Sequence, residues 1–115
     1  MKVKLLRIYF GESDRFEGKF RSGTPAYHAV VECLHRNGIS GATVFRGIEG
    51  YGVHSILHTA SILRLSEDLP IVVEVVETEE RLNPILPELL EIVKDELVLL
   101  MDAEVLMGHK FKEDV

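Results

Sequence analysis

The stretch IVVEVVE, residues 71–77, decides the fold of this chain. Its β-branched side chains are those most favoured in strands, and two glutamates alone interrupt the apolar run, so we predict a β-strand here. After it the period changes to three and four residues, which predicts a helix with Thr78 as its N-cap. Pro84 and Pro87 each remove an amide donor and should segment the first half of that helix. Its apolar face consists of Leu82, Ile85, Leu86, Leu89, Leu90 and Val93.

The sequence before this strand predicts another strand, a long loop and a helix. Residues 3–10 are aliphatic and aromatic, which predicts a strand, and residues 11–23 are polar and rich in glycine, which is typical of a loop. Thr24 and Pro25 are expected to be the N-cap and the first helical residue, because that position needs no amide donor. Gly38 would end the helix in a left-handed conformation. The apolar stripe of the helix consists of Ala26, Ala29, Val30, Cys33 and Leu34.

Two further strands complete the predicted order of elements. Residues 42–48 form a compact apolar strand, and residues 97–107 form the last one. Residues 50–68 follow no single period but are too apolar for a disordered linker, so we expect a long connection that a partner orders in part. The order strand-helix-strand-strand-helix-strand predicts one α+β, ferredoxin-like domain over residues 1–108, a four-stranded antiparallel sheet with both helices on one face. Residues 109–115 should form a charged C-terminal tail.

Apolar side chains occupy both sides of the outer predicted strands, as Val44 and Phe45 or Leu99 and Leu100 illustrate. The helices can cover one face of the sheet, so the other face should be buried against something else. A homo-oligomer is the simplest explanation. The alternative is that the long connection and the C-terminal tail fold back over that face.

The stretch GATVFRGIEGYG, residues 41–52, joins a predicted strand to closely spaced glycines and an arginine. Glycine permits positive φ and close approach to the main chain. In one interpretation, the amides of Gly47, Gly50 and Gly52 face an anion or an adenine ring, and Arg46 adds charge-assisted hydrogen bonds. In the other, the stretch is a tight turn without a ligand. It matches neither a P-loop nor a Rossmann fingerprint, so generic nucleotide motifs do not decide between them.

Composition narrows the classes of function. The chain has 115 residues and a formal charge of -6, which disfavours nucleic acids and anionic membranes as partners. The single cysteine, Cys33, cannot form an intramolecular disulfide, and no apolar run reaches a membrane-spanning length. We therefore expect a cytoplasmic protein that is not inserted in a membrane. Because Cys33 lies on the apolar stripe of its helix, a core role is favoured over a nucleophilic one.

Histidine spacing gives weak support for a metal site. His54 and His58 are four residues apart and His28 and His35 are seven apart, but neither pair has a third ligand at a suitable spacing. We predict no metal site. Residues 50–53 lack the basic residue and the final aromatic of the RNA-binding signature, which also disfavours RNA.

Several short motifs together point to a known family. They are GESD (residues 11–14), GK (18–19), GATV (41–44), RG (46–47), GYG (50–52), HT (58–59) and LSEDLP (65–70). This combination resembles the PII-like family designated domain of unknown function 190, over about residues 4–107. That family is related to the PII nitrogen-signalling proteins, which are ferredoxin-like homotrimers.

The resemblance implies a regulatory protein and not an enzyme. It implies a homotrimer that binds an adenine nucleotide (ADP, ATP or AMP) between subunits. The loop at residues 50–68 would contact an unknown target protein, such as a membrane transporter or channel. Two alternatives stay open: a structural or divalent-cation-binding trimer without a nucleotide site, similar to the divalent-cation tolerance proteins, and a small enzyme. The enzyme is disfavoured because no nucleophile, base and orienting residue stand in a recognisable relation.

The resemblance also implies a set of nucleotide-binding residues. PII proteins hold the phosphates with a loop rich in glycine and lysine before the last strand, whereas this chain has the short Lys94-Asp95-Glu96 there. The loop over residues 11–21 would then take this role, with Lys19 as a point charge and Arg46 as a planar fork. The alternative for that loop is a solvated surface. The expected nucleotide-binding residues are Gly11, Asp14, Gly18, Lys19, Thr43, Arg46, Gly47, Gly50 and Gly52.

Overall fold

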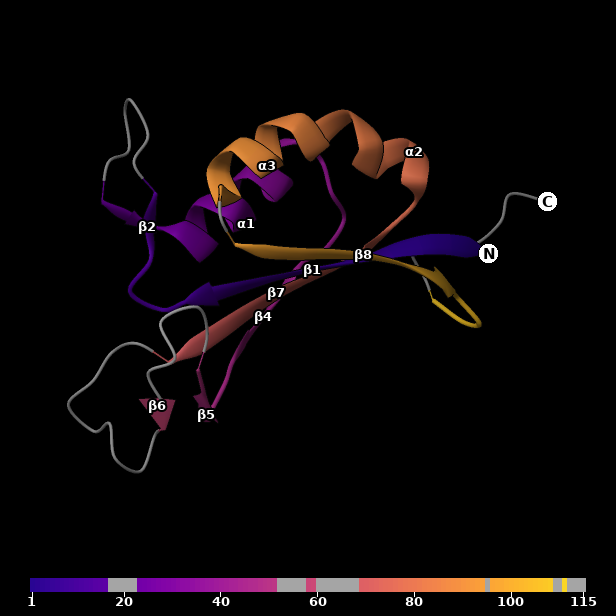
Figure 1. Cartoon of the computed structure of the whole chain (residues 1–115). Helices are drawn as coiled ribbons and strands as arrows, with labels where there is room; N and C mark the ends of the chain where they lie inside the picture. Colours follow the sequence, from indigo (N-terminus) through magenta and orange to yellow (C-terminus); the bar gives the residue numbers. More distant parts are fainter. Residues whose placement is uncertain (17–22, 52–57, 60–68, 95, 109–110, 112–115) are drawn as a thin grey trace.

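The computed structural model of the chain has two layers, with the helices packed on one face of a twisted sheet (Figure 1). It describes residues 1–16, 23–51, 58–59, 69–94, 96–108 and 111. The strands are β1 (Lys2–Gly11), β2 (Arg15–Phe16), β3 (Thr24–Pro25), β4 (Thr43–Arg46), β5 (Glu49–Gly50), β6 (His58–Thr59), β7 (Pro70–Glu77) and β8 (Leu97–Glu104). The helices are α1 (Ala26–Arg36), α2 (Glu79–Leu82), the short 3-10 helix η1 (Asn83–Ile85) and α3 (Leu86–Val93).

The main sheet has four strands in the order β4-β7-β1-β8, and all neighbours are antiparallel. This is the predicted ferredoxin-like arrangement, so the predicted fold class is confirmed. The strand predicted at residues 71–77, extended by one residue to Pro70, is β7, which pairs with β4 on one side and β1 on the other. The sheet formed by the described residues therefore ends in two open edges, β4 and β8.

The core lies between the sheet and the helices. In β7 every second residue from Ile71 to Glu77 is buried, as the pleat of a strand with one covered face requires. Leu82 and Leu89 from the second helical segment have no exposed surface, and burial of each contributes roughly 1.5–3 kcal/mol. The buried carboxylate of Glu77 accepts hydrogen bonds from the backbone N–H of Thr78 at 2.9 Å and from the N–H and hydroxyl of Ser40 at 3.4 Å.

The predicted start of α1 is wrong, and its predicted end is confirmed. Thr24 and Pro25 are not cap and first helical residue, because they form β3 and pair with β2. Pro25 has extended backbone (φ -52°, ψ 132°) and itself occupies the N-cap position. At the other end Gly38 has φ +76°, and its N–H donates to His35 O at 3.1 Å. Ile39 N–H donates to Leu34 O at 3.1 Å, which completes a Schellman motif.

The second helical region is segmented as the prolines predict. It divides into α2, η1 and α3, with Pro84 in η1 and Pro87 in the first turn of α3. Thr78 occupies the N-cap position of α2 but makes no side-chain capping bond, and its N–H is bound by Glu77 instead.

Two strands are shorter than the sequence predicts. β4 ends at Arg46, because its partner β7 begins at Pro70 and offers no ladder beyond it. β8 ends at Glu104, which pairs with Lys2 at the start of β1. In both cases the length of the partner strand sets the limit, and this is a non-local property.

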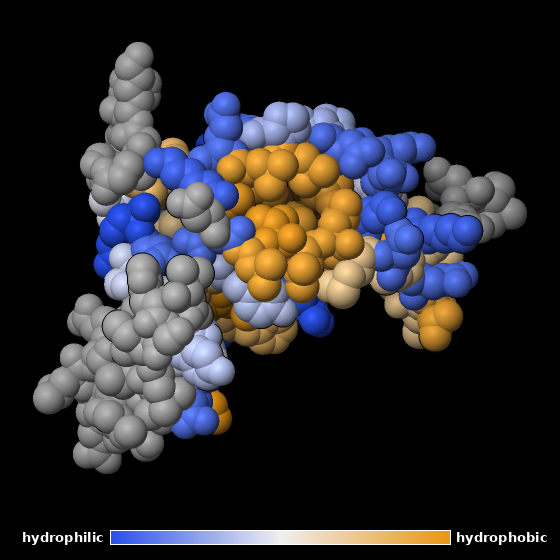
Figure 2. Space-filling view, viewed as in Figure 1, coloured by the Kyte–Doolittle hydropathy of each residue, from blue (hydrophilic) through white to orange (hydrophobic). Residues whose placement is uncertain are grey.

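Large apolar side chains remain exposed on both faces of the edge strands. Val44 and Phe45 on β4 are 41% and 50% exposed, and Leu99 and Leu100 on β8 are 37% and 45% exposed. Figure 2 shows an apolar patch over α3 and β8, and Leu90 of α3 is 48% exposed. Exposure on both sides agrees with the predicted need for a further covering layer. The predicted C-terminal tail lies, apart from Phe111, outside the described residues.

Candidate functional site

Several of the expected site residues lie at one end of the sheet. Gly11, the last residue of β1, pairs with Pro70, and Arg46, the last residue of β4, pairs with Ile71. The small β2–β3 and β5–β6 pairs lie at the same end, away from the N-terminus (Figure 1). The topology thus brings together two segments that are distant in sequence.

Close contact with Pro70 explains why two of the expected residues, Gly47 and Gly50, have no side chain. A Cβ atom added at Gly50 would lie 2.7 Å from Pro70 Cγ, and one at Gly47 would lie 3.2 Å from Pro70 Cβ. Gly47 N–H also donates to Pro70 O at 2.7 Å. Neither glycine has φ in the left-handed region. Of the two properties expected of glycine, close approach to the main chain is therefore the one used here.

Arg46 is held by a carboxylate from the other segment. Its Nε donates to Glu12 Oε2 at 2.7 Å and its Nη2 to Glu12 Oε1 at 2.9 Å, a bidentate ion pair. The Arg46 side chain is 54% exposed and the Glu12 side chain 22% exposed. The hydrogen bond to Glu12 raises the pKa of Arg46 above its ordinary value.

Asp14 organises the turn after β1. Its carboxylate Oδ2 accepts the N–H of Gly11 at 2.8 Å, and its own N–H donates to Gly11 O at 3.1 Å. Its carbonyl accepts the N–H of Ala26 at 2.8 Å, which ties the turn to the start of α1. The contacts of Asp14 are thus those of a residue that shapes the loop.

Thr43, another of the expected residues, lies apart from Arg46. Thr43 is exposed on β4 opposite Glu74, roughly 10 Å along the strand from Arg46 by the ordinary rise per residue. Strand alternation directs Thr43 to the helix-free face and Arg46 to the helix-covered one. Gly18, Lys19 and Gly52 lie outside the described residues.

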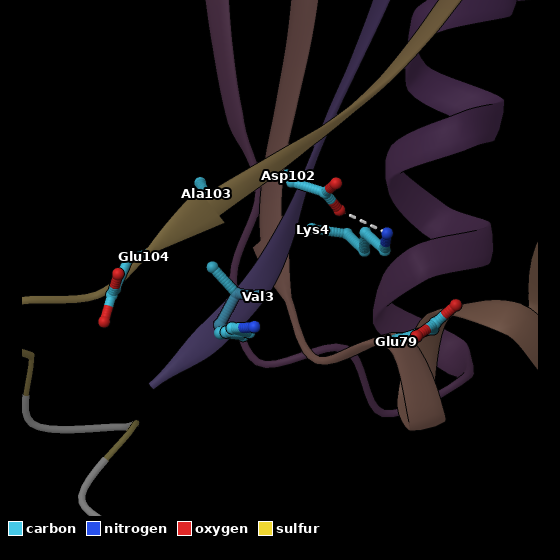
Figure 3. Close-up of a pocket in the computed structure, with 7 residues that line it drawn as sticks. Val3, Lys4, Glu79, Asp102, Ala103 and Glu104 are labelled. Carbon is cyan, nitrogen blue, oxygen red and sulfur yellow. Dashed lines mark hydrogen bonds and ion pairs between the residues drawn. The ribbon is translucent and has the colours of Figure 1, made fainter.

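A separate cavity of about 500 Å³ lies at the opposite end of the sheet. Lysines 2 and 4, Glu79, Asp102 and Glu104 line it together with Val3 and Ala103 (Figure 3). A hydrogen bond joins Lys4 to Asp102, which raises the pKa of Lys4 and lowers that of Asp102. None of the expected nucleotide-binding residues in the described ranges lines this cavity.

Cys33 lies in a polar cluster between α1 and α3. Its buried Sγ donates to Glu88 Oε2 at 3.5 Å, and Arg36 Nη2 donates to both oxygens of the same carboxylate. Burial, and then Glu88, raise the pKa of the Cys33 thiol to about 11. Burial alone would also raise the pKa of Glu88, but hydrogen bonds from Asn37, Cys33 and Arg36 outweigh it and lower that pKa. A thiol of this kind is protonated at neutral pH and is a poor nucleophile.

Within the described ranges, no group of three or more His, Cys, Asp or Glu side chains could hold a metal ion. His54, from one of the two histidine pairs considered in the sequence, lies outside those ranges. No helix in the described part of the chain is long and apolar enough to cross a membrane.

Sequence reasoning missed two residues of this sheet end, Glu12 and Pro70. Glu12 belongs to the GESD motif, but nothing local predicts that it pairs with an arginine 34 residues away. Pro70 ends the LSEDLP motif, but its contacts with two glycines depend on the pairing of β4, β7 and β1. The partners of Glu12 and Pro70 are therefore determined by the register of the strands and not by the local sequence.

Comparison with known proteins places the chain in a family. The model of DUF190, described as "Uncharacterized ACR, COG1993", matches residues 3–105. The chain is 41% identical over 113 residues to UPF0166 protein MJ1524 of Methanocaldococcus jannaschii, covering 97% of this chain and 99% of that protein. A UPF0166 protein of Aquifex aeolicus is 38% identical over 106 residues, covering 92% of this chain and 95% of that protein.

Solved structures share the fold at low sequence identity. CPII, a nitrogen regulatory PII-like protein from Thiomonas intermedia K12 bound to ADP, AMP and bicarbonate, has a TM-score of 0.66 and 19% identity, covering 91% of this chain and 89% of that chain. A candidate PII-like signaling protein from Thermus thermophilus has a TM-score of 0.62 and 20% identity, with 97% of each chain covered. The fold is thus that of PII-like proteins, and the chain belongs to the DUF190 family.

Proposed function

We propose that the protein is a PII-like regulatory protein of the cytoplasm that binds an adenine nucleotide between the subunits of a homotrimer. Occupancy would be signalled through the segment at residues 50–68 to a target protein, such as a membrane transporter or channel. The protein would act as a sensor and not as an enzyme. The proposed domain comprises residues 1–108, followed by the tail at residues 109–115.

The observation that carries the proposal is the convergence of two segments on Pro70. Gly11, whose N–H donates to the Asp14 carboxylate, pairs with Pro70 on one side, and Gly47 and Gly50, which follow Arg46 in the chain, lie against Pro70 on the other. The half-exposed guanidinium of Arg46 supplies a cation with the geometry that a phosphate group needs. In PII-like CPII, a protein of the same fold, ADP and AMP are bound. A nucleotide is therefore the ligand class that we assign to this sheet end.

The exposed apolar side chains support an oligomer. Both edge strands of the described sheet are open, and both carry exposed apolar residues, Val44 and Phe45 on β4 and Leu99 and Leu100 on β8. An interface between two different edges is heterologous, and such interfaces close into rings when the rotation allows it. A trimer would cover this surface and could place a second subunit beside the sheet end that holds Arg46.

Calorimetric titration with ATP, ADP and AMP tests the ligand. We expect binding by the native protein and a loss of roughly tenfold or more in Arg46→Ala, because a charged hydrogen bond contributes about 1.5–3 kcal/mol. Arg81→Ala is the matched control, since it removes the same charge from an exposed position on α2. No heat with any nucleotide at millimolar concentration would refute the proposed ligand, and equal losses in both variants would refute the role of Arg46.

Light scattering tests the assembly. We expect three times the chain mass of 13.0 kDa for the native protein. Leu99→Asp should dissociate it, because the substitution puts a charge on a face that the oligomer would bury. Asn83→Asp is the control, since it adds the same charge at an exposed polar position on η1, away from the exposed apolar residues of the sheet edges. A native mass of one chain would refute the oligomer.

A further inference from the structure

The ion pair between Glu12 and Arg46 crosses the end of the sheet. β7 lies between β4, which ends at Arg46, and β1, which ends just before Glu12. The pair therefore spans the first residues of β7 and joins two segments that the proposed ligand would contact. Both hydrogen bonds of the pair use the Nε and Nη2 edge of the guanidinium.

A phosphate group can bind that same edge in the same bidentate way. A guanidinium binds carboxylate and phosphate with the same planar fork, so the two anions compete for the same donors. We propose that Glu12 is an intramolecular competitor of the anionic ligand, and that ligand binding exchanges the Arg46–Glu12 pair for an Arg46–phosphate pair. This inference rests on the proposed function, because it requires Arg46 to bind the ligand.

The backbone contacts around Glu12 allow such an exchange without loss of the loop. Glu12 N–H donates to Leu69 O at 2.9 Å, and Gly11 N–H donates to the Asp14 carboxylate at 2.8 Å. These bonds do not involve the Glu12 side chain. Release of the carboxylate therefore changes the position of one side chain and the charge that it presents, and the turn after β1 keeps its shape.

The exchange has two consequences for the proposed sensor. Without ligand, Arg46 is held in place by Glu12 and its charge is compensated, which lowers affinity for weakly charged anions. With ligand, the Glu12 carboxylate loses its ion pair with the Arg46 guanidinium, and that guanidinium no longer compensates its charge. Whether Glu12 is paired with Arg46 thus depends on whether the site is occupied. A ligand shifts an equilibrium between two states only through different contacts in each, and this exchange supplies such a difference.

Calorimetric titration of ADP and ATP into the native protein, Glu12→Gln and Glu49→Gln tests the competition. Exposed ion pairs are weak, so we expect Glu12→Gln to bind roughly two- to fivefold more tightly than the native protein. Glu49→Gln removes the same charge from an exposed residue of β5, and we expect no change. Arg46→Ala and the double variant Glu12→Gln/Arg46→Ala complete a double-mutant cycle, in which the gain from Glu12→Gln should disappear when Arg46 is absent.

The outcomes separate this inference from the proposed function. If Glu12→Gln binds no more tightly than the native protein while Arg46→Ala binds more weakly, the competition is wrong and the nucleotide site stands. If Glu12→Gln and Glu49→Gln gain equally in nucleotide affinity, or if the gain from Glu12→Gln persists without Arg46, a general charge effect explains the gain and the competition is wrong. If the native protein binds no nucleotide, both the site and the competition are refuted. Circular dichroism and light scattering of each variant confirm that fold and oligomeric state are retained.

Discussion

The close approach of Gly50 to Pro70 predicts a strong and specific effect of Gly50→Ala. The new Cβ would lie 2.7 Å from Pro70 Cγ, a distance that forces one of the two segments to move. Pro70 is constrained, because its carbonyl accepts the N–H of Gly47 and it pairs with Gly11. The backbone of Gly50 does not have left-handed φ, so the substitution introduces a steric conflict and no intrinsic backbone strain.

The magnitude follows from the identity of the opposing atoms. Overpacking of this kind costs roughly 1–3 kcal/mol of unfolding free energy. In a Pro70→Ala background the opposing Cγ is gone, and the nearest remaining atom is Cβ, 3.8 Å away in the native geometry, an ordinary contact. There Gly50→Ala should stabilise by about 0.4–1 kcal/mol, because alanine restricts the unfolded chain. The sign of the effect should therefore reverse between the two backgrounds.

Urea unfolding at fixed protein concentration measures this double-mutant cycle. Gly38→Ala is the matched control: Gly38 has φ +76° and no atom within 4 Å of an added Cβ. Its cost comes from the left-handed backbone, about 1–2 kcal/mol, and should be the same in the native and the Pro70→Ala backgrounds. If Gly50→Ala has the same effect in both backgrounds, the contact with Pro70 is not the reason for glycine at this position.

Three further predictions concern the core and its buried polar groups. Because the pKa of Cys33 is raised to about 11 from 9.0, the native thiol should resist iodoacetamide at pH 8, and rapid alkylation of the native protein would contradict this. The free energy of unfolding should also fall as pH rises from about 9 to 11, and Cys33→Ala should abolish this part of the pH dependence. Leu89→Ala should lower the free energy of unfolding in urea by about 2–5 kcal/mol, because Leu89 is fully buried. Leu90→Ala should lower it clearly less, because Leu90 is 48% exposed, and equal losses would contradict the assigned core. Glu77→Ala should cost about 1–3 kcal/mol in the same assay, because it removes the buried carboxylate that accepts the partly buried N–H groups of Ser40 and Thr78. Glu79→Ala, at an exposed position, should be nearly neutral. A neutral Glu77→Ala would show that water replaces the carboxylate.

The elements of the fold could be predicted from local patterns where the local signal and the tertiary context agree. The nearly continuous β-branched run at residues 71–77 forms β7 as predicted, and Gly38 has the left-handed conformation expected at a helix end. Thr24 and Pro25 show the opposite case. Their types suit a helix start, but pairing with Arg15 and Phe16 makes them a strand, and that pairing cannot be read from either segment alone.

The candidate site was predictable as a region and not as a set of contacts. The glycines and Arg46 indicated where the chain is unusual, and register then determined which partner each one meets. Glycine permits both positive φ and close approach, and at Gly47 and Gly50 positive φ is absent and the small size allows the approach to Pro70. Arg46, expected to give charge-assisted hydrogen bonds to a ligand, gives them to Glu12 within the chain, because the order β4-β7-β1 brings the ends of two strands within reach of one ion pair.

The placement of Thr43 bears on how a nucleotide could use both it and Arg46. The two residues belong to the same strand but lie on opposite faces of it, with Thr43 opposite Glu74 and Arg46 opposite Ile71. A ligand that contacts both must therefore pass around the open edge of β4, where the described part of a single chain provides no enclosing wall. In the proposed homotrimer a second subunit would supply that wall. Dissociation by Leu99→Asp should then abolish nucleotide binding as well, even though Leu99 is on the opposite edge of the sheet from both residues.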